Sequence, residues 1–313
     1  MRRLLILADD FTGACDAAAP FASSRGTLVV HGLPAAWPSN AEAIDVLSVD
    51  LDLRERSSAH AEVVAREAAQ QLCSARPSAD VLLKIDSTLR GPIAGLVAGA
   101  LQGSGRAVAV LAPAFPEQGR LFRDGRVYVD GLAGGSLTEA LGMEHTALLG
   151  ANFARSAEAV ELAVEHARTR GARHVVVDAD GPASLQSLAT AWRRHAAEWL
   201  LVGSAGLARQ IARGPASHAR QIAGGAPASH ARQTAGSAPA SHARQIAGSA
   251  SARRNEGLLS ATARGPVLIV AGSPTPQTQA QIERLRGLGP IVVIGAQTPV
   301  PPRPSGAHEV IVV

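Results

Sequence analysis

The sequence KIDSTLRG places two cations, one carboxylate and two hydroxyl groups within a single run of eight residues. These groups suit a polyhydroxy carboxylate. Arg90 would bind a planar carboxylate group, and Lys84 would supply a point charge. Asp86 and Ser87, with Thr88 beside them, would bind hydroxyl groups. A salt-bridged loop that binds no ligand is the alternative.

A second polar group, ADDFTG, follows a short apolar run near the N-terminus. Asp9 and Asp10 would end a buried strand, and Thr12 would open the next helix. Amide groups at a helix N-terminus, together with Thr12, can hold an anion, and a carboxylate there can accept a hydroxyl proton or orient a metal. Helix capping by Asp10 or Thr12 is the alternative, but it leaves two adjacent acids after a buried strand unexplained.

Lys84 is the only lysine in the chain, which uses arginine at its 29 other basic positions. A compact ammonium and a planar guanidinium are not interchangeable at a tight site, so the exception favours a function for Lys84 over codon bias. Arg54 and Arg56 follow another predicted strand and could add a cation. A solvated charge run explains those two arginines equally well.

Two turns made of small residues resemble the strand-to-helix turns whose backbone amides approach phosphate. The first contains Gly203 and Ser204, and the second contains Gly272, Ser273 and Thr275. Each turn alone is a weak signal. The chain has no Walker A loop, and its partial Gly-x-Gly precedes a strand, so a dinucleotide-binding turn is not indicated.

Apolar runs that alternate with helix-like stretches predict the elements that would position these residues. The expected strands are Leu4–Leu7, Thr27–Val30, Ile44–Val49, Val81–Ile85, Ala107–Leu111, His174–Val177, Trp199–Val202, Val267–Val270, Ile291–Ile294 and Glu309–Val313. This alternation predicts an α/β fold with mostly parallel sheets and flanking helices. Functional loops in such folds follow the carboxyl ends of the strands, which is where the polar groups fall.

Composition excludes several classes of protein. Hydrophobic residues make up 46% of the chain and aromatic residues 3%, which disfavours single-strand nucleic-acid binding. The net charge of +4 comes from 207–255, which contains seven arginines and no acidic residue. The rest of the chain has 23 basic and 26 acidic residues and is therefore slightly acidic. The two cysteines are far apart, and no cysteines or histidines have zinc-ligand spacing, so we expect no resident metal. The sequence shows neither a signal peptide nor a membrane span, so we expect a cytoplasmic protein without a membrane partner. We also expect no nucleic-acid partner.

A tandem repeat with a period of twelve residues occupies 214–249. Each unit offers one Ile or Thr and a boundary proline, so we expect a linker and not a solenoid core. The sequence therefore predicts a sugar-acid-binding domain at 1–212, a low-complexity linker at 213–262 and a partial nucleotide-binding domain at 263–313. The last of these ends inside a strand pattern, so we expect it to be incomplete.

Taken together, the motifs resemble those of the four-carbon acid sugar kinase family, ATP-dependent enzymes that phosphorylate threonate, erythronate or oxo-tetronate. The matching pieces are ADDFTGA at 8–14, KIDSTLRG at 84–91, PAFPEQGR at 113–120, DGRVYVDG at 124–131, VGSAGLA at 202–208 and AGSPTPQT at 271–278. The first two are highly specific, and the order of all six matches over most of the chain. A later Gly-Gly-Asp-Thr type nucleotide loop of the family is absent.

The resemblance implies ATP and Mg²⁺ as cofactors and a sugar acid as substrate, and it is compatible with a homodimer. A substrate hydroxyl would attack the γ-phosphate in line, and Asp10 or Asp86 would receive its proton. Asp9, Thr12, Arg56, Lys84, Ser87, Thr88 and Arg90 would bind the substrate, while Gly203, Ser204, Gly272, Ser273 and Thr275 would bind the nucleotide. A non-catalytic sugar-acid-binding remnant without a complete ATP site is the alternative, and a folded remnant that binds nothing is a third.

Overall fold

The computed structural model describes residues 2–33, 44–214, 267–269, 291–293 and 310–312. The chain divides into two compact units, Met1–Ala216 and Ser217–Val313. The twelve-residue repeat lies outside the described residues from 215 onwards, so its predicted role as a linker stays a prediction. The first unit carries the fold that positions the polar motifs.

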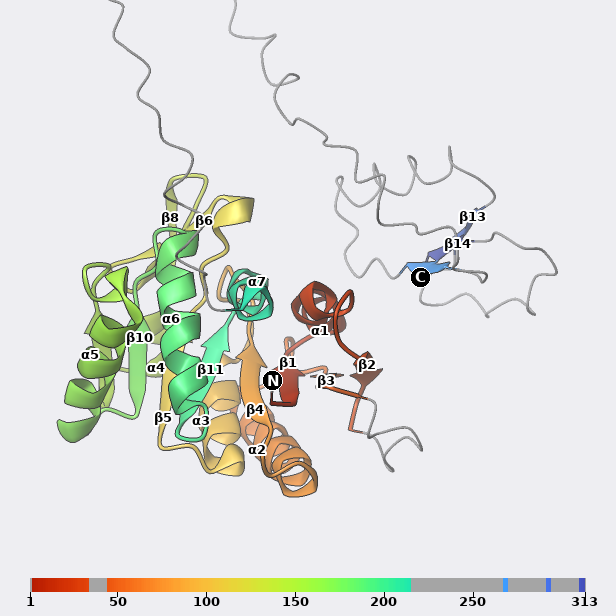
Figure 1. Cartoon of the computed structure of the whole chain (residues 1–313), viewed down its shortest axis with the longest axis horizontal. Helices are drawn as coiled ribbons and strands as arrows, with labels where there is room; N and C mark the ends of the chain where they lie inside the picture. The colour runs from red at the N-terminus through yellow and green to blue at the C-terminus, as the bar shows by residue number, and fades with distance from the viewer. Residues whose placement is uncertain (1, 34–43, 215–266, 270–290, 294–309, 313) are drawn as a thin grey trace, which may run out of the picture. The chain divides into compact units, whose positions relative to one another are not determined.

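A parallel sheet of eight strands forms the centre of the first unit (Figure 1). The strand order is β2-β3-β1-β4-β11-β5-β10-β9. The strands are β1 (Leu4–Ala8), β2 (Thr27–His31), β3 (Val46–Asp50), β4 (Asp80–Lys84), β5 (Val108–Ala112), β9 (Thr146–Leu149), β10 (His174–Val177) and β11 (Trp199–Gly203). The central strands are Val-, Leu- and Ile-rich and buried at every position but one, because helices cover both faces of the sheet. The predicted α/β fold with a mostly parallel sheet is confirmed.

The register of the sheet brings the carboxyl ends of six neighbouring strands to one level. The paired residues at this level are His31, Asp50, Ala8, Lys84, Gly203 and Ala112, in order across the sheet. We call this line the carboxyl edge. The motifs that begin at Asp9 and at Lys84 therefore leave the sheet side by side, as expected for parallel strands.

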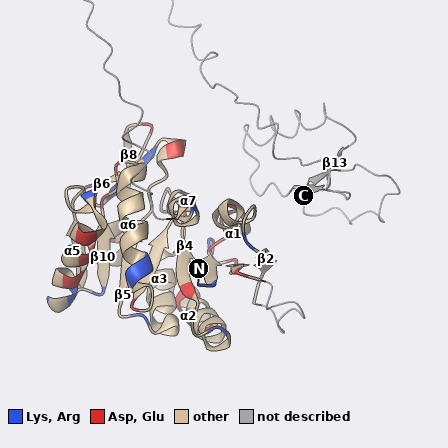
Figure 2. Cartoon of the chain, viewed as in Figure 1, with Lys and Arg blue, Asp and Glu red and all other residues tan. Residues whose placement is uncertain are grey.

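Helices lie in two layers, as right-handed crossovers between parallel strands require. One layer contains α2 (Ser58–Ala75), α3 (Ile93–Ser104) and the short α4 (Leu137–Leu141); the other contains α1 (Phe11–Ala18), α5 (Ala157–Thr169), α6 (Pro182–His195) and α7 (Ala205–Arg213). Short 3-10 turns occur at Ala19–Phe21, Pro116–Gln118 and Phe153–Arg155. Figure 2 shows acidic positions on α5 beside basic positions on α6, where Arg194 binds Glu158 and Glu161 at 3.1 and 2.8 Å.

Three glycines on one side of α3 allow it to lie directly against α2. A Cβ atom on Gly95, Gly99 or Gly103 would stand 2.0 to 2.1 Å from a backbone carbonyl oxygen of α2. Those carbonyls belong to Ser58, Glu62 and Arg66, which are spaced by one helical turn like the glycines themselves. The helix pair that supports β4 from one face is therefore packed backbone to backbone.

A small antiparallel sheet, β6-β7-β8, follows β5 and stands beside the carboxyl edge. Its strands are β6 (Arg120–Arg123), β7 (Arg126–Val129) and β8 (Leu132–Ser136). Neither β8 nor the edge strand β9 is among the strands expected from the sequence, because their mostly exposed or half-exposed residues carry no clear apolar pattern. Phe122 bridges to Ala179 after β10, which ties the small sheet to the large one.

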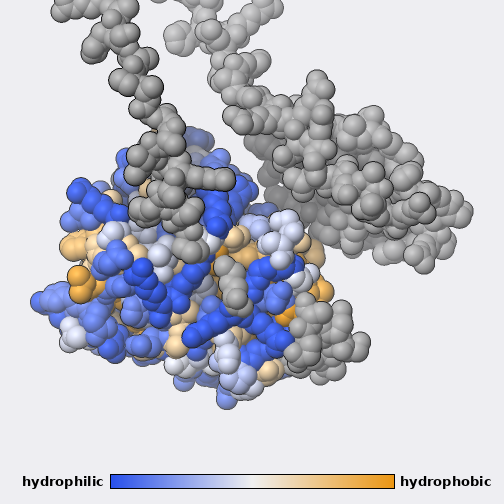
Figure 3. Space-filling model, viewed as in Figure 1, coloured by the Kyte–Doolittle hydropathy of each residue, from blue (hydrophilic) through white to orange (hydrophobic). Residues whose placement is uncertain are grey.

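In the second unit the described residues form a parallel sheet in the order β12-β14-β13, with β12 at Val267–Ile269, β13 at Ile291–Val293 and β14 at Val310–Val312. All ten expected strands are thus confirmed, with ends that shift by one or two residues. Within the described part of the chain no helix has the length and apolar character needed to cross a membrane. The visible face of the first unit is mostly hydrophilic with small hydrophobic patches (Figure 3).

Candidate functional site

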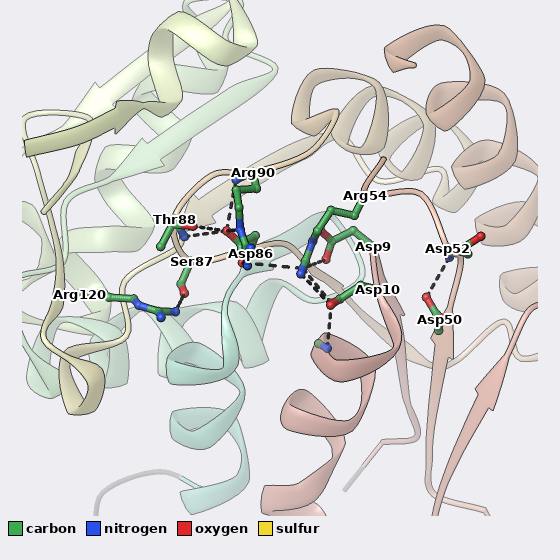
Figure 4. A network of polar contacts seen from close by, with 11 residues as sticks. Asp9, Asp10, Asp50, Asp52, Arg54, Asp86, Ser87, Thr88, Arg90 and Arg120 are labelled. Atoms are coloured by element: carbon green, nitrogen blue, oxygen red, sulfur yellow. Dashed lines mark hydrogen bonds and ion pairs between the residues drawn. The ribbon is translucent and has the colours of Figure 1, made fainter. Parts of the chain in front are cut away.

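Arg54 joins the two adjacent aspartates that follow β1 (Figure 4). Its Nε and Nη2 atoms donate to Asp9 Oδ2 and Oδ1 at 2.8 and 2.9 Å, and its Nη1 and Nη2 atoms donate to Asp10 Oδ2 and Oδ1 at 2.6 and 2.8 Å. The same Nη2 atom lies 3.8 Å from Asp86 Oδ1. One guanidinium therefore links all three carboxylates of the two motifs.

Backbone contacts bring Arg54 to this position. The amides of Leu53 and Arg54 both donate to the carbonyl of Asp9, at 2.9 and 3.0 Å. The Asp9 side chain is 0% exposed, and this burial raises the pKa of its carboxyl group, while Arg54 and Lys84 oppose the rise. A buried carboxylate needs such partners, so Arg54 both neutralises the charge of Asp9 and stabilises the fold of the site.

Asp10 is the N-cap of α1 and the more accessible member of the pair. Its Oδ1 accepts a hydrogen bond from the amide of Gly13 at 2.8 Å, so the capping that the sequence offered as an alternative does occur. Its side chain is 24% exposed, against 0% for Asp9. Capping therefore does not exclude a functional role, because Asp10 also pairs with Arg54 and faces solvent.

Lys84 ends β4 and lies over the first turn of α1. A Cβ atom on Gly13 would stand 2.7 Å from Lys84 Nζ and 2.5 Å from Asp10 Oδ1, so only glycine leaves room for this approach. Lys84 is 5% exposed, and burial lowers the pKa of its ammonium group, whereas Asp9 and Asp10 act in the opposite sense. The single lysine of the chain thus lies beside the carboxylates of Asp9 and Asp10, and its predicted role in binding a ligand stays a prediction.

Asp86 is held by the rest of its own loop. Arg90 donates to it from Nε at 3.0 Å and from Nη2 at 2.9 Å, and Thr88 donates from its amide at 3.1 Å and from its hydroxyl group. Burial alone would raise the pKa of Asp86, but Arg90, Thr88 and the charge of Arg54 hold it well below its usual range. Leu89 has a φ of +63°, which lets the loop fold back on itself.

Ser87 connects this loop to the small sheet. Arg120, the first residue of β6, donates from Nη1 to the Ser87 hydroxyl group. Figure 4 places Arg120 on the far side of Ser87 from Arg54. The hairpin that carries Arg120 is anchored by Asp178, whose carboxylate accepts hydrogen bonds from the amides of Asp124 and Gly125 at 2.9 and 3.0 Å.

Two more charged residues belong to this region, and sequence reasoning missed both. Asp16 lies one turn beyond Thr12 in α1. Asp16 is an exposed residue, and the charges of Lys84, Arg209 and Arg120 attract its carboxylate group. Arg209 of α7 stacks over the ring of Phe115 at 4.9 Å from its centroid. Because residues four apart share a helix face, the position of Asp16 relative to Thr12 could have marked it.

Several predicted site residues lie elsewhere or in other roles. Arg56 is exposed and pairs with Asp52 at 2.9 Å, so Arg54 takes the position next to the motif. Thr12 is half-buried in the first turn of α1. The remaining candidates, Gly272, Ser273 and Thr275, lie outside the described residues.

Gly203 and Ser204 serve the packing of α7. Ser204 is 1% exposed; its hydroxyl group donates to the carbonyl of Ala114 at 2.7 Å and accepts from the amide of Gly206 at 3.2 Å. A Cβ atom on Gly203 would stand 2.7 Å from the carbonyl oxygen of Ala112. The small residues of this turn let α7 approach β5 closely, which explains them without a nucleotide.

The carboxylates of the site do not form a ready metal site. In the parts of the chain that the structure describes, no three His, Cys, Asp or Glu side chains are grouped so that they could hold a metal ion. Both oxygens of Asp9, Asp10 and Asp86 accept hydrogen bonds from arginines or backbone amides. Mg²⁺ is commonly held by one or two free carboxylates plus substrate phosphates, and these carboxylates are already paired.

Residues 4–155 and 136–211 match a family described as "Sugar-binding N-terminal domain". Two curated relatives are each similar to about two thirds of the chain. A D-threonate kinase of Cupriavidus necator is 33% identical over 226 residues, 66% of this chain and 53% of that protein. A 3-oxo-tetronate kinase of Methylobacterium radiotolerans is 29% identical over 238 residues, 68% of this chain and 55% of that protein. The chain spans about half the length of these relatives.

A solved structure is also similar. It is a domain of unknown function from Bordetella bronchiseptica, crystallised with bound citrate as a domain-swapped dimer. The TM-score is 0.59 and the sequence identity 25%, with 99% of this chain and 73% of that chain covered. The match over 4–155 and 136–211 shows that the chain belongs to the family described as "Sugar-binding N-terminal domain".

Proposed function

This chain belongs to the four-carbon acid sugar kinase family, and we propose that its first unit binds a four-carbon sugar acid for phosphorylation by ATP. Threonate, erythronate and oxo-tetronate are the candidate substrates. The observation that carries the proposal is the group in which Arg54 joins Asp9, Asp10 and Asp86 beside the buried Lys84. Carboxylates and cations held at fixed positions suit a small ligand with several hydroxyl groups and a negative charge.

Asp10 is the better candidate to accept the proton of the reacting hydroxyl group. Burial raises the pKa of Asp86, but Arg90, Thr88 and Arg54 lower it by more, so the pKa lies well below its usual range. The Asp86 carboxylate is therefore a weak base. Asp9 is fully buried, whereas Asp10 is partly exposed at the start of α1. The site would therefore use Asp86 to bind a hydroxyl group and Asp10 to take the proton.

Lys84 and the amide end of α1 would stabilise negative charge near the reacting hydroxyl group. Gly13 contributes by leaving space for Lys84 at that helix end. Thr12, Ser87 and Thr88 would add hydroxyl groups around the ligand. These roles rest on side chains of the first unit alone.

ATP would supply the phosphoryl group, with Mg²⁺ bound to its phosphates. Gly272, Ser273 and Thr275 are the residues of this chain proposed for the nucleotide, whereas the packing of Gly203 and Ser204 favours a structural role for that turn. The paired carboxylates do not fit Mg²⁺ as they stand, so no catalytic step is assigned to the metal. A cytoplasmic location and a homodimer complete the proposal; the Bordetella bronchiseptica relative forms a dimer.

A sugar-acid-binding protein without kinase activity is the second candidate. It is favoured by the described site itself, whose carboxylates and cations all belong to the first unit, and by the turn at Gly203 and Ser204, which serves helix packing. Both candidates use the same binding site, so they differ in the fate of the ligand and not in its recognition.

Calorimetric titration separates the candidates. D-threonate, D-erythronate and ATP are titrated into the full chain, and ADP release is measured with both substrates and Mg²⁺ present. The kinase proposal expects binding of one acid, binding of ATP and turnover. Binding of an acid without binding of ATP would leave the second candidate, and failure to bind any four-carbon acid would exclude both.

A further inference from the structure

The six charged side chains that belong to the two motifs and to Arg54 balance one another in formal charge. Three are carboxylates and three are cations: Asp9, Asp10, Asp86, Arg54, Lys84 and Arg90. Their formal charges sum to zero. An acid ligand bound only by this group would bring a negative charge with no cation to neutralise it, which is costly at a partly buried site.

Arg90 is a poor choice for the ligand carboxylate, although its residue type suggested it. Its Nε and Nη2 atoms both donate to Asp86, at 3.0 and 2.9 Å. This is the two-point geometry that an arginine would otherwise offer to a substrate carboxylate. Using it for the ligand would release Asp86, which is only 7% exposed, from its main partner.

Arg120 is in a different position. Its described hydrogen bond goes to the uncharged hydroxyl group of Ser87, and no carboxylate among the described residues forms an ion pair with it. Its hydrogen bond to Ser87 nevertheless places the guanidinium next to the loop that holds Asp86, so Arg120 borders the same site. Arg120 is therefore a cation next to the six charged side chains, whose formal charges already sum to zero without it.

The backbone around Arg120 is also well anchored. Its amide and carbonyl pair with the carbonyl and amide of Phe115 at 3.1 and 2.8 Å. Farther along the hairpin, the Asp178 carboxylate holds the turn that joins β6 to β7 through two backbone amides. An arginine on a fixed strand loses less freedom when it binds a ligand than one on a free loop.

We propose that Arg120, with Ser87 beside it, binds the carboxylate of the sugar acid and so selects acids over neutral polyols, whereas Arg90 holds Asp86 in place. This assignment rests on the proposed function and deepens it, because it names the residue that recognises the acid group. The hydroxyl groups of the ligand then face Asp86 and Asp10, and its carboxylate faces the small sheet.

The test compares a four-carbon acid with its uncharged amide. The ligands D-threonate and D-threonamide are titrated by calorimetry, without ATP, into the full chain and into Arg120→Gln, Arg120→Lys and Arg90→Gln. Arg123→Gln, an exposed arginine on the same strand, is the matched control. We expect Arg120→Gln to lose roughly tenfold to hundredfold in affinity for the acid and to bind the amide almost as the wild type does. Arg120→Lys should keep part of the preference for the acid.

Each other outcome overturns a specific statement. If Arg120→Gln weakens acid and amide equally, Arg120 only supports the fold of the site and the inference fails, while the proposed function stands. If Arg90→Gln abolishes the preference for the acid and Arg120→Gln keeps it, Arg90 binds the carboxylate. If the wild type binds neither ligand, nor D-erythronate nor an oxo-tetronate, the proposed function fails together with the inference.

Discussion

The guanidinium of Arg54 meets the buried carboxylate of Asp9 edge to edge, with Nε 2.8 Å from Oδ2 and Nη2 2.9 Å from Oδ1. Removing one partner of a buried pair leaves the other charge without compensation. We therefore expect Arg54→Gln to lower the free energy of unfolding by about 3–5 kcal/mol in urea denaturation. Arg56→Gln, which breaks an exposed pair with Asp52, should cost less than about 1 kcal/mol. Equal costs in the two variants would contradict this account.

Gly13→Ala tests the contact between α1 and Lys84. The added methyl group would displace the ends of two side chains, Asp10 and Lys84, and not backbone. Alanine is also the better helix former by up to about 1 kcal/mol. We expect stability to change by less than about 1 kcal/mol, while affinity for the sugar acid falls by roughly tenfold or more because both charged groups move.

Gly181→Ala is the control for that variant, since no atom lies within 4 Å of its added methyl group and its φ is extended. It should leave affinity for the acid unchanged. Unaltered binding by Gly13→Ala would mean that the position of Lys84 is unimportant for the ligand.

Asp86 should make the stability of the protein depend on pH in acid. Its pKa is lower in the folded chain than the 3.8 expected when unfolded, because Arg90, Thr88 and Arg54 outweigh the effect of burial. The unfolded chain therefore binds the proton first as pH falls, and the stabilisation present above pH 3.8 is lost below it, by at most about 1.4 kcal/mol per pH unit.

Urea denaturation of the wild type and of Asp86→Asn between pH 6 and pH 2.5 measures this effect. The difference in unfolding free energy between them should be constant at the upper end and shrink below about pH 4. Arg90→Gln, which removes two of the hydrogen bonds, should show a shallower dependence. A difference that stays constant down to pH 2.5 would exclude a lowered pKa for Asp86.

Ser204→Ala distinguishes a packing role from a nucleotide-binding role. The variant loses both the cap of α7 and the hydrogen bond to Ala114, at a cost of about 1–3 kcal/mol. Ser156→Ala removes the cap of α5 without a second backbone contact of the kind that Ser204 makes, and should cost about 1 kcal/mol. We expect ATP affinity, measured by calorimetry, to be unchanged in Ser204→Ala; a large loss of ATP affinity with normal stability would reinstate the nucleotide role.

The sequence predicted the large sheet because its strands are buried on both faces and so appear as unbroken Val-, Leu- and Ile-rich runs. β8 could not be predicted in the same way, since Leu132–Ser136 is exposed at its first four positions and contains two glycines. Its pairing depends on β7, and such tertiary effects outweigh local strand preference.

The two motifs of the site were predictable from residue types, but their partners were not. Arg54 and Arg56 are indistinguishable in sequence, and only the hydrogen bonds of Leu53 and Arg54 to the backbone of Asp9 decide which one turns inward. Arg120 comes from another sheet, 33 residues from Ser87. Distant contacts of this kind have no local signal, so the sequence predicted the three carboxylates and Arg90 but could neither choose Arg54 over Arg56 nor place Arg120 in the site.

The three glycines of α3 have one more consequence. Each lies over a carbonyl of α2, and the carbonyls repeat with the same spacing as the glycines. A rotation of α3 by one residue, about 100° around its axis, would turn Leu96 or Ala100 toward that backbone, where neither side chain has room. The two helices therefore pack this closely in one register. The strand β4, which connects α2 to α3 in the chain and ends at Lys84, is attached to both helices of this fixed pair.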